Sequence, residues 1–279
     1  MDACNNTEDP RKLEMSANDI TTFIPALKKT VAFPDDLVKK LAGITPIQRA
    51  IDKTRKLGVG DHNIHLLTDS EEVRLIAERN GIGCYWEPGL VLDERILQKK
   101  LYQYILGKSK QNQFILILSP YAVLLTTTLI EQTLQALAES KKDILKPFKR
   151  ENIKIFDDNY QNTFVSIIGV TKQTHLVECK AFTLLKSEAI SKGRKRKLNI
   201  LPWEVDHDLY EISSLQDWWV CEKLLQRKRI VFRVIGNDEV GMGHIYRTLS
   251  LAHEISDHEI LFVSDYENIV AVNKLAGYD

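Results

Sequence analysis

The sequence predicts an α/β fold, a three-layer sandwich in which helices cover both faces of a sheet. Apolar, strand-like runs alternate with segments of helical period from Ile20 to about Leu225, which is the order typical of α/β domains. The run Phe114–Leu118 (FILIL) is apolar at every position, as expected of a strand buried on both faces. The length of 279 residues suits one such domain followed by a smaller unit.

The expected strands are short runs rich in β-branched and apolar residues. In chain order they are Ile20–Ile24, Asn63–Leu67, Phe114–Leu118, Thr163–Val170 and Ala181–Leu185. A basic cluster at Gln226–Arg229 precedes a fresh strand, and we place a domain boundary there. The chain then divides into a polar, flexible tail (1–19), a large domain (20–226) and a short βαβ segment (227–279).

The expected helices begin at residues that cap a first turn and end at glycine or in polar sequence. With their signals they are Thr45-Pro46 to Gly58, Asp69 or Ser70 to Gly81, and Thr126 to Glu139. Proline suits the first helical position because its missing N–H has no partner there in any case. Glycine after the last turn adopts the left-handed conformation that ends many helices.

Composition excludes several classes of function. Lys and Arg number 38, as do Asp and Glu, so the zero net charge does not favour a nucleic acid or an anionic membrane as partner. The four cysteines form no C-x-x-C pair, which speaks against a zinc site or a disulfide framework. The polar N-terminus has no apolar signal core. We expect a cytoplasmic protein without a membrane span.

A series of segments matches the motifs of one enzyme family in the family's own order. These segments are Leu41–Asp52, Leu66–Ile82, Trp86–Glu94, Ile115–Glu131 and Tyr210–Glu222. Together they resemble the acylneuraminate (CMP-sialic acid) cytidylyltransferases over about residues 20–225. The resemblance implies a nucleotide-diphospho-sugar-transferase-like, Rossmann-like sandwich. It also implies CTP and a nonulosonic acid sugar as substrates, CMP-sugar and diphosphate as products, and Mg²⁺ as cofactor.

The family's triphosphate loop, P-A-R-x-G-S-K, corresponds here to PALKKT, which begins at Pro25. Leu27 stands at the arginine of that motif, so Lys28 and Lys29 are the remaining candidates for binding phosphate. Asp69, at the carboxyl end of a predicted strand, is a further candidate for nucleotide binding, because α/β sheets present ligand-binding groups there. The alternative for Asp69 is a helix N-cap.

Other family positions have also changed. The motif Q-P-T-S-P-L-R corresponds to the segment from Ser119 to Leu125, which lacks both the glutamine and the arginine. The metal-binding D-I-D corresponds to Glu211, Ile212 and Ser213, so Glu211 is the one candidate ligand. The resemblance therefore implies a cytidylyltransferase-like protein with an eroded site. The alternative is a catalytically silent scaffold of the same fold, and a homo-oligomer remains open.

A glycine-rich turn marks the C-terminal segment. In Arg229–Ile255 a strand leads into Gly241-Met242-Gly243-His244 and an amphipathic helix with a predicted apolar stripe of Tyr246, Leu249 and Ala252. The pattern resembles the G-x-G-H-x-x-R-x-L-x-L-A motif of the UDP-sugar hydrolases of pseudaminic acid and spore-coat polysaccharide synthesis, which have a glycosyltransferase-B fold. The resemblance makes His244 the base that activates water.

That fold needs two lobes, and only the start of one is present. The segment is therefore either part of a longer bifunctional protein or an addition to the first domain. The alternative is a plain strand-turn-helix corner.

Overall fold

The computed structural model describes most of the chain, and residues that it does not describe interrupt it in several places. The described residues are 19–28, 32–90, 99–109, 112–151, 174–192, 198–205, 209, 211–235, 242–264, 273 and 275–276. The expected strand Thr163–Val170, Lys29 and nearly all of the expected N-terminal tail lie outside them. The chain forms two compact units, Met1–Cys221 and Glu222–Asp279, whereas the sequence places the boundary between residues 226 and 227.

The first unit is built on a sheet of eight strands among the described residues. They are β1 (Ile20–Pro25), β2 (Ile64–Thr68), β3 (Gly83–Trp86), β4 (Phe114–Leu118), β5 (Ile144–Glu151), β6 (His175–Glu178), β7 (Phe182–Lys186) and β8 (Ile200–Glu204). Their order is β3-β2-β1-β4-β7-β5-β6, with β8 paired to β5. The four strands from β3 to β4 are parallel, and β7 is antiparallel to β4. The predicted central position of the FILIL strand is confirmed.

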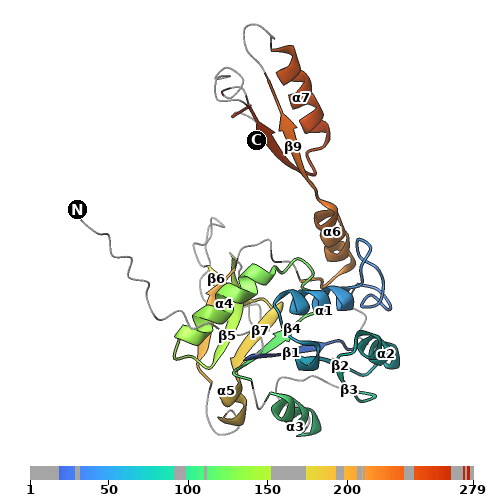
Figure 1. Ribbon diagram of the computed structural model, residues 1–279, viewed down its shortest axis with the longest axis vertical. Helices are drawn as coiled ribbons and strands as arrows, with labels where there is room; N and C mark the ends of the chain where they lie inside the picture. Colours follow the sequence, from blue (N-terminus) through green and yellow to red (C-terminus); the bar gives the residue numbers. More distant parts are fainter. Residues whose placement is uncertain are drawn as a thin grey trace, which may run out of the picture. The chain divides into compact units, whose positions relative to one another are not determined.

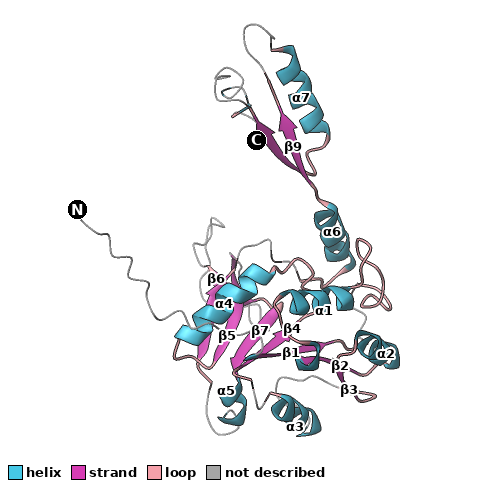
Figure 2. Ribbon diagram, viewed as in Figure 1, coloured by secondary structure: helices cyan, strands magenta, loops and turns pink. Residues whose placement is uncertain are grey.

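Helices cover both faces of this sheet, as the sequence predicts (Figures 1 and 2). They are α1 (Pro46–Lys56), α2 (Glu71–Asn80), α3 (Lys99–Lys108), α4 (Thr127–Glu139) and α5 (Ser187–Lys192), with a short 3-10 turn at Asp61–Asn63. Buried residues of α1, α2 and α4 belong to the larger hydrophobic core. Buried residues of α3 form a second core on the other face of the sheet, where part of α5 also packs. The three-layer sandwich is therefore confirmed.

Strand β4 shows why the sheet needs both layers. Phe114, Leu116 and Leu118 lie in the larger core, whereas Ile115 and Ile117 contact the second core. Side chains alternate between the two faces of a strand, so a strand without polar residues is stable only when both faces are covered.

The predicted helix caps are partly confirmed. Thr45 caps α1 by accepting a hydrogen bond from the N–H of Gln48, with Pro46 at the first helical position. Thr126 caps α4 in the same way, from the N–H of Leu129. Ser70 holds the N-cap position of α2 but makes no side-chain capping hydrogen bond.

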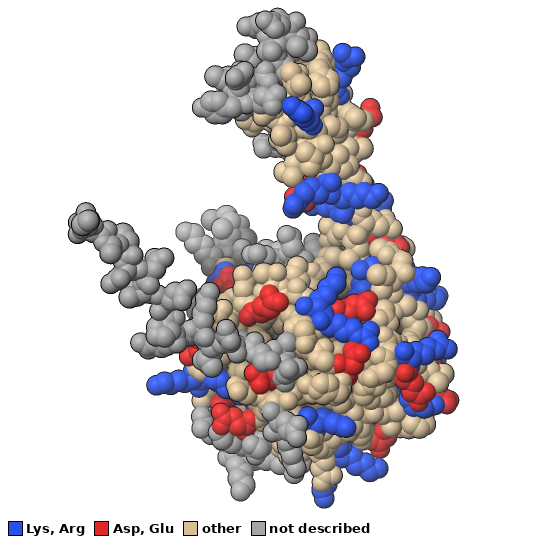
Figure 3. Space-filling model, in the orientation of Figure 1, with Lys and Arg blue, Asp and Glu red and all other residues tan. Residues whose placement is uncertain are grey.

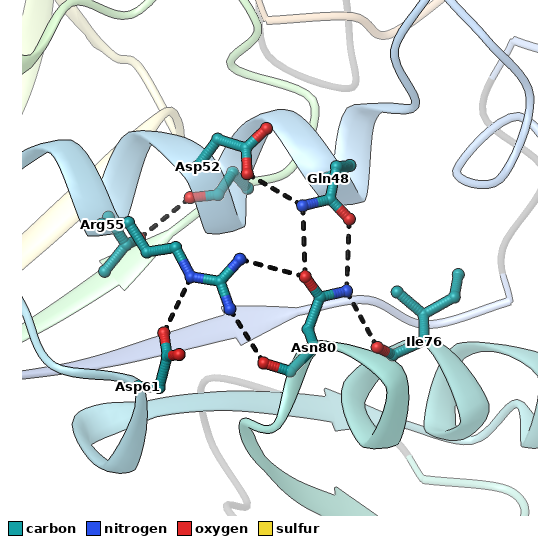
Figure 4. A network of polar contacts seen from close by, with 8 residues as sticks. Gln48, Asp52, Arg55, Asp61, Ile76 and Asn80 are labelled. Carbon is teal, nitrogen blue, oxygen red and sulfur yellow. Dashed lines mark hydrogen bonds and ion pairs between the residues drawn. The ribbon is translucent and has the colours of Figure 1, made fainter.

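A network of polar side chains ties α1 to the end of α2 (Figure 4). The amide of Asn80 exchanges hydrogen bonds of 3.2 Å with the amide of Gln48. The guanidinium of Arg55 donates to both oxygens of Asn80, at 3.1 Å and 2.8 Å, and to Asp61 at 2.8 Å. One of these bonds satisfies the last carbonyl of α2, a group that the helix itself leaves without a partner.

A buried histidine lies beneath α3. His65 is 2% exposed, stacks on Phe23 and shares a hydrogen bond of 2.9 Å between its Nδ1 and the hydroxyl of Tyr104. A Cβ added to Gly83 would come within 2.0 Å of the ring, so the neighbouring strand must carry glycine here. Burial, with smaller contributions from the charges of Lys108 and His62, lowers the pKa of His65 to about 4.

The second unit contains a parallel β-α-β arrangement of β9 (Arg229–Arg233), α7 (Gly243–Glu254) and β10 (Glu259–Val263). Helix α6 (Leu215–Gln226) spans the boundary between the units. The predicted apolar stripe on α7 is wrong in one position. Ile245, Thr248 and Ala252 are the buried residues, whereas Tyr246 is 53% exposed. The buried face of α7 is therefore rotated towards Ile245 and Thr248, each one residue before a position of the predicted stripe.

Two further properties follow from the described part of the chain. None of its helices is both long and apolar enough to cross a membrane. On the face of the first unit shown in Figure 3, acidic and basic side chains are intermingled. This arrangement agrees with the zero net charge.

The stability of the first unit should depend on pH through His65. Its pKa is about 4 in the folded state against roughly 6.5 in an unfolded chain. The contribution of the neutral His65 to the free energy of unfolding is therefore complete above pH 6.5. It is lost as the pH falls towards 4, by up to about 3 kcal/mol. Urea unfolding between pH 7 and 4 should show a smaller loss for His65→Gln than for the unsubstituted protein. His62→Gln, a change at an exposed histidine nearby, is the control. Identical pH profiles for all three proteins would contradict the expectation.

Candidate functional site

The carboxyl ends of β1, β2 and β4 meet at one edge of the sheet because these neighbouring strands are parallel. Open α/β sheets bind their ligands at this edge, where chain segments leave adjacent strands in the same direction. Neighbouring strands lie about 4.8 Å apart, so the ends of β2 and β4, with β1 between them, are separated by roughly 10 Å. The loops that follow these strands therefore form one candidate site.

Asp69, directly after β2, anchors the loop that follows β1. Its Oδ1 accepts a hydrogen bond of 2.7 Å from the backbone N–H of Lys28. The N-cap position of α2 belongs to Ser70, so the interpretation of Asp69 as the helix cap is wrong. Two of the predicted site residues, Lys28 and Asp69, are thus joined by a hydrogen bond.

A pocket of about 350 Å³ opens beside this hydrogen bond. It is lined by Lys28, by the segment Pro34–Val38 and by Ser70, Glu72 and Val73 at the start of α2. Its volume is near the lower end of the range of roughly 300–1,000 Å³ that is usual for small-molecule sites. The side chain of Lys28 reaches it as a cation whose Nζ lies 3.5 Å from Asp35.

Tyr121 and Asp36 hold the wall of the pocket in place. Asp36 is 1% exposed and accepts hydrogen bonds from the Tyr121 hydroxyl at 2.7 Å and from the N–H of Ala32 at 2.8 Å. Burial and the hydrogen bond to Asp36 raise the pKa of the Tyr121 hydroxyl. The segment that lines the pocket is thereby fixed to the loop after β4.

Glu211 lies at the end of β4. Its Oε1 accepts a hydrogen bond of 3.2 Å from Ser119, which in turn accepts one from the N–H of Tyr121 at 3.3 Å. Burial raises the pKa of the Glu211 carboxyl, while the bond from Ser119 and the positive charges of Lys180 and Lys149 act in the opposite direction. Glu211 does not line the pocket itself.

Leu27 and Leu125, the apolar residues at two motif positions of the resembled family, both contact the hydrophobic cores. Leu27 packs against the core beneath α3, and Leu125 is 3% exposed in the larger core. Both side chains therefore contribute to the packing of the loops on the sheet.

The site offers few ligands for a metal ion. No group of three His, Cys, Asp or Glu side chains gathers closely enough to hold one in the described part of the chain. Mg²⁺ is commonly held by one or two carboxylates together with the phosphates of a substrate. Glu211 offers one carboxylate to such a shared ion, and the described residues do not form a cage around it.

Three residues near the site were not singled out by sequence reasoning. Asp36 lies in no motif, Tyr121 lies in a motif segment without having been assigned a role, and their hydrogen bond joins positions 85 residues apart in sequence. Lys53 on α1 donates a hydrogen bond of 2.7 Å to the carbonyl of Ala122. Burial, together with the charges of Arg49 and Lys56, lowers the pKa of Lys53 to about 7. A lysine among the apolar positions of α1 is the one signal that could have drawn attention to it.

His244 lies in the second unit, as the second residue of α7. It is exposed, and its Nδ1 is 3.4 Å from the carbonyl oxygen of Ile235. Arg247, three residues further along α7, places its Nε 3.3 Å from the carbonyl oxygen of Gly243. The predicted position of His244 at an exposed helix start agrees with this geometry, and a role as base remains a prediction.

Comparison with known proteins gives a fold and no family. No family model matches the chain, and no curated protein sequence matches it. Among solved structures, 4-diphosphocytidyl-2C-methyl-D-erythritol synthase from Anaerococcus prevotii matches with a TM-score of 0.54 at 12% identity, over 76% of this chain and 100% of that chain. CMP:2-keto-3-deoxy-manno-octonic acid synthetase complexed with CTP matches with a TM-score of 0.54 at 10% identity, over 75% and 98%. The chain therefore has a nucleotidyltransferase-like, Rossmann-type fold.

Removing the hydroxyl of Tyr121 should loosen the pocket wall. Tyr121→Phe leaves the buried Asp36 short of one donor, which typically costs about 1–3 kcal/mol. The matched control is Tyr102→Phe, which removes a hydroxyl hydrogen bond to the carbonyl of Ile190 on the other face of the sheet. Hydrogen exchange should speed up around Pro34–Val38 in the first variant and not in the second. Unchanged exchange in this segment would show that Tyr121 does not hold it.

The exposed His244 should contribute little to stability, in contrast to its neighbour Ile245, which is 0% exposed. Changes at exposed positions usually stay within ±0.5 kcal/mol, whereas Ile→Ala in a core costs about 2–5 kcal/mol. The melting temperature of the second unit should therefore be unchanged in His244→Asn and strongly lowered in Ile245→Ala. A large loss in His244→Asn would point to a structural role for the histidine.

Proposed function

We propose that this chain binds a cytidine nucleotide in the pocket beside Asp69 and is a cytidylyltransferase-like protein for acidic sugars of the nonulosonic type. The observation that carries the proposal is the place of the pocket. It opens at the carboxyl ends of β1 and β2, in a fold shared with a solved synthetase of a CMP-linked sugar acid in complex with CTP.

The proposed reaction joins the two substrates through one new bond. A hydroxyl oxygen of the sugar acid attacks the α-phosphorus of CTP. The bond from that phosphorus to the bridging oxygen breaks, and diphosphate leaves. The hydroxyl proton passes to a base or to solvent, which gives CMP-sugar and diphosphate. Negative charge gathers on the phosphoryl oxygens, so catalysis depends on cations and hydrogen-bond donors around them.

The residues present supply some of these groups. Lys28 and Lys29 are proposed to offer positive charge to the phosphates, and Asp69 holds the loop that carries Lys28 by the hydrogen bond to its N–H. Glu211 would hold a Mg²⁺ ion shared with the phosphates. Bound there, Mg²⁺ would neutralise phosphate charge and make the α-phosphorus more electrophilic.

Several groups that the resembled family uses are replaced, and this limits the rate. Loss of one well-placed donor costs about 10²–10³ in rate, and here Leu27, Ser119 and Leu125 stand at such positions. The second candidate is therefore a silent scaffold of the same fold. It is favoured by the burial of Leu125 in the larger core and by the packing of the partly buried Leu27 against the second core, because apolar side chains used in packing do not supply charge to a nucleotide.

Titration calorimetry with CTP and Mg²⁺ tests the binding step. We expect a dissociation constant in the high micromolar range or weaker, because each missing charged hydrogen bond removes about 1.5–3 kcal/mol, or one to two decades of affinity. Asp69→Asn should keep this affinity because an amide oxygen can still accept from Lys28, whereas Asp69→Ala should lose it. Diphosphate release with a nine-carbon 2-keto sugar acid then separates the enzyme from the silent scaffold.

Two results would count against this picture. Low-micromolar binding of CTP would show that the site has been rebuilt and is not eroded. The absence of binding by any cytidine compound would overturn the proposed function.

A further inference from the structure

The pocket has an acidic lining. Three carboxylates, Asp35, Asp36 and Glu72, line it together with a single cation, Lys28, among the described residues. The fully buried Asp36 is committed to Tyr121 and to the N–H of Ala32. A site for a nucleoside triphosphate would be expected to show the opposite balance of charge, because like charges brought together reduce affinity.

The charge of Lys28 is already opposed within the pocket. Its Nζ lies 3.5 Å from the Oδ1 of Asp35, and both side chains are partly exposed, at 61% and 47%. An exposed ion pair of this kind is weak, but it places a carboxylate beside Lys28, the single cationic side chain among the described residues that line the pocket. A phosphate that approached Lys28 would therefore also approach Asp35.

The N-terminus of α2, beside the pocket, does not make the pocket favourable for anions. The N-terminus of a helix favours anions through its free N–H groups and its dipole. Here the first turn carries Glu71 and Glu72, whose charges oppose that effect. The lining also contains apolar surface from Pro34, Leu37 and Val73, which suits the uncharged base and ribose of a nucleoside.

We infer that the pocket selects the nucleoside part of its ligand and disfavours the phosphates, with Asp35 and Glu72 as the residues that determine this specificity. The inference rests on the proposed function, because it takes the ligand to be a cytidine compound. It explains how the pocket can accept such a ligand although the triphosphate-binding arginine of the resembled family is replaced by Leu27. The phosphates of CTP would lie at the open side of the pocket, and of the residues proposed to meet them only the exposed Lys28 belongs to the pocket lining.

The inference gives an order of affinities that a phosphate-binding site would reverse. With EDTA present, cytidine should bind best, CMP less well and CTP about tenfold more weakly than cytidine, because each added charge faces acidic side chains. Salt screens these repulsions over about 10 Å at 0.1 M. Raising the salt concentration should therefore strengthen CTP binding and leave cytidine binding unchanged.

Two variants test the residues named. Asp35→Asn and Glu72→Gln should each reduce the difference in affinity between cytidine and CTP about threefold, since each removes one charge that repels the phosphates. Asparagine suits position 35, where the backbone has a φ of 61°, because it tolerates this left-handed conformation better than most residues. Glu71→Gln is the matched control, because Glu71 begins the same helix turn and does not line the pocket.

Titration calorimetry of cytidine, CMP and CTP at two salt concentrations decides between the outcomes. The order cytidine, CMP, CTP, with CTP binding strengthened by salt, supports the inference. CTP binding that is equal to or tighter than cytidine binding, or that weakens with salt, overturns the inference and leaves the proposed function standing. The absence of binding by all three compounds overturns both.

Discussion

The burial of β1 and β4 on both faces is the constraint on which the rest of the first unit depends. Three of the six residues of β1, Ile20, Phe23 and Ile24, belong to one core or the other, and β4 has no polar side chain. Two layers of helices are needed to cover such strands, and crossover helices of this kind make neighbouring strands parallel. The carboxyl ends of β1, β2 and β4 then meet at one edge, and the pocket lies at that edge.

At this edge, carboxylates are used to build the loops. Asp69 holds the N–H of Lys28, Asp36 holds Tyr121 and Ala32, and Glu211 accepts from Ser119. Hydrogen bonds to charged acceptors contribute more than neutral ones, so these bonds give the loops a fixed shape. Carboxylates committed in this way are less free to hold a metal ion, which agrees with the sparse set of metal ligands in the described residues.

The second unit meets a different physical requirement. A two-stranded sheet is only marginally stable by itself, and β9 and β10 are stabilised by packing against α7 through Val234 and Ile245. The helix therefore faces the sheet with Ile245 and leaves Tyr246 exposed. Packing on the strands, and not the average apolar content of the helix, sets its rotation.

The sequence by itself determined the layers, the central strand and the helix starts at Thr45 and Thr126, because these follow from local hydrophobic period and capping chemistry. It also placed Asp69 and Lys28 at the candidate site. It did not show that the two residues are joined by a hydrogen bond, that Tyr121 reaches Asp36, or that Lys53 is partly buried with a lowered pKa. Only the tertiary structure decided these points, because each depends on how segments distant in the chain meet at the sheet edge, and no local pattern encodes such a meeting.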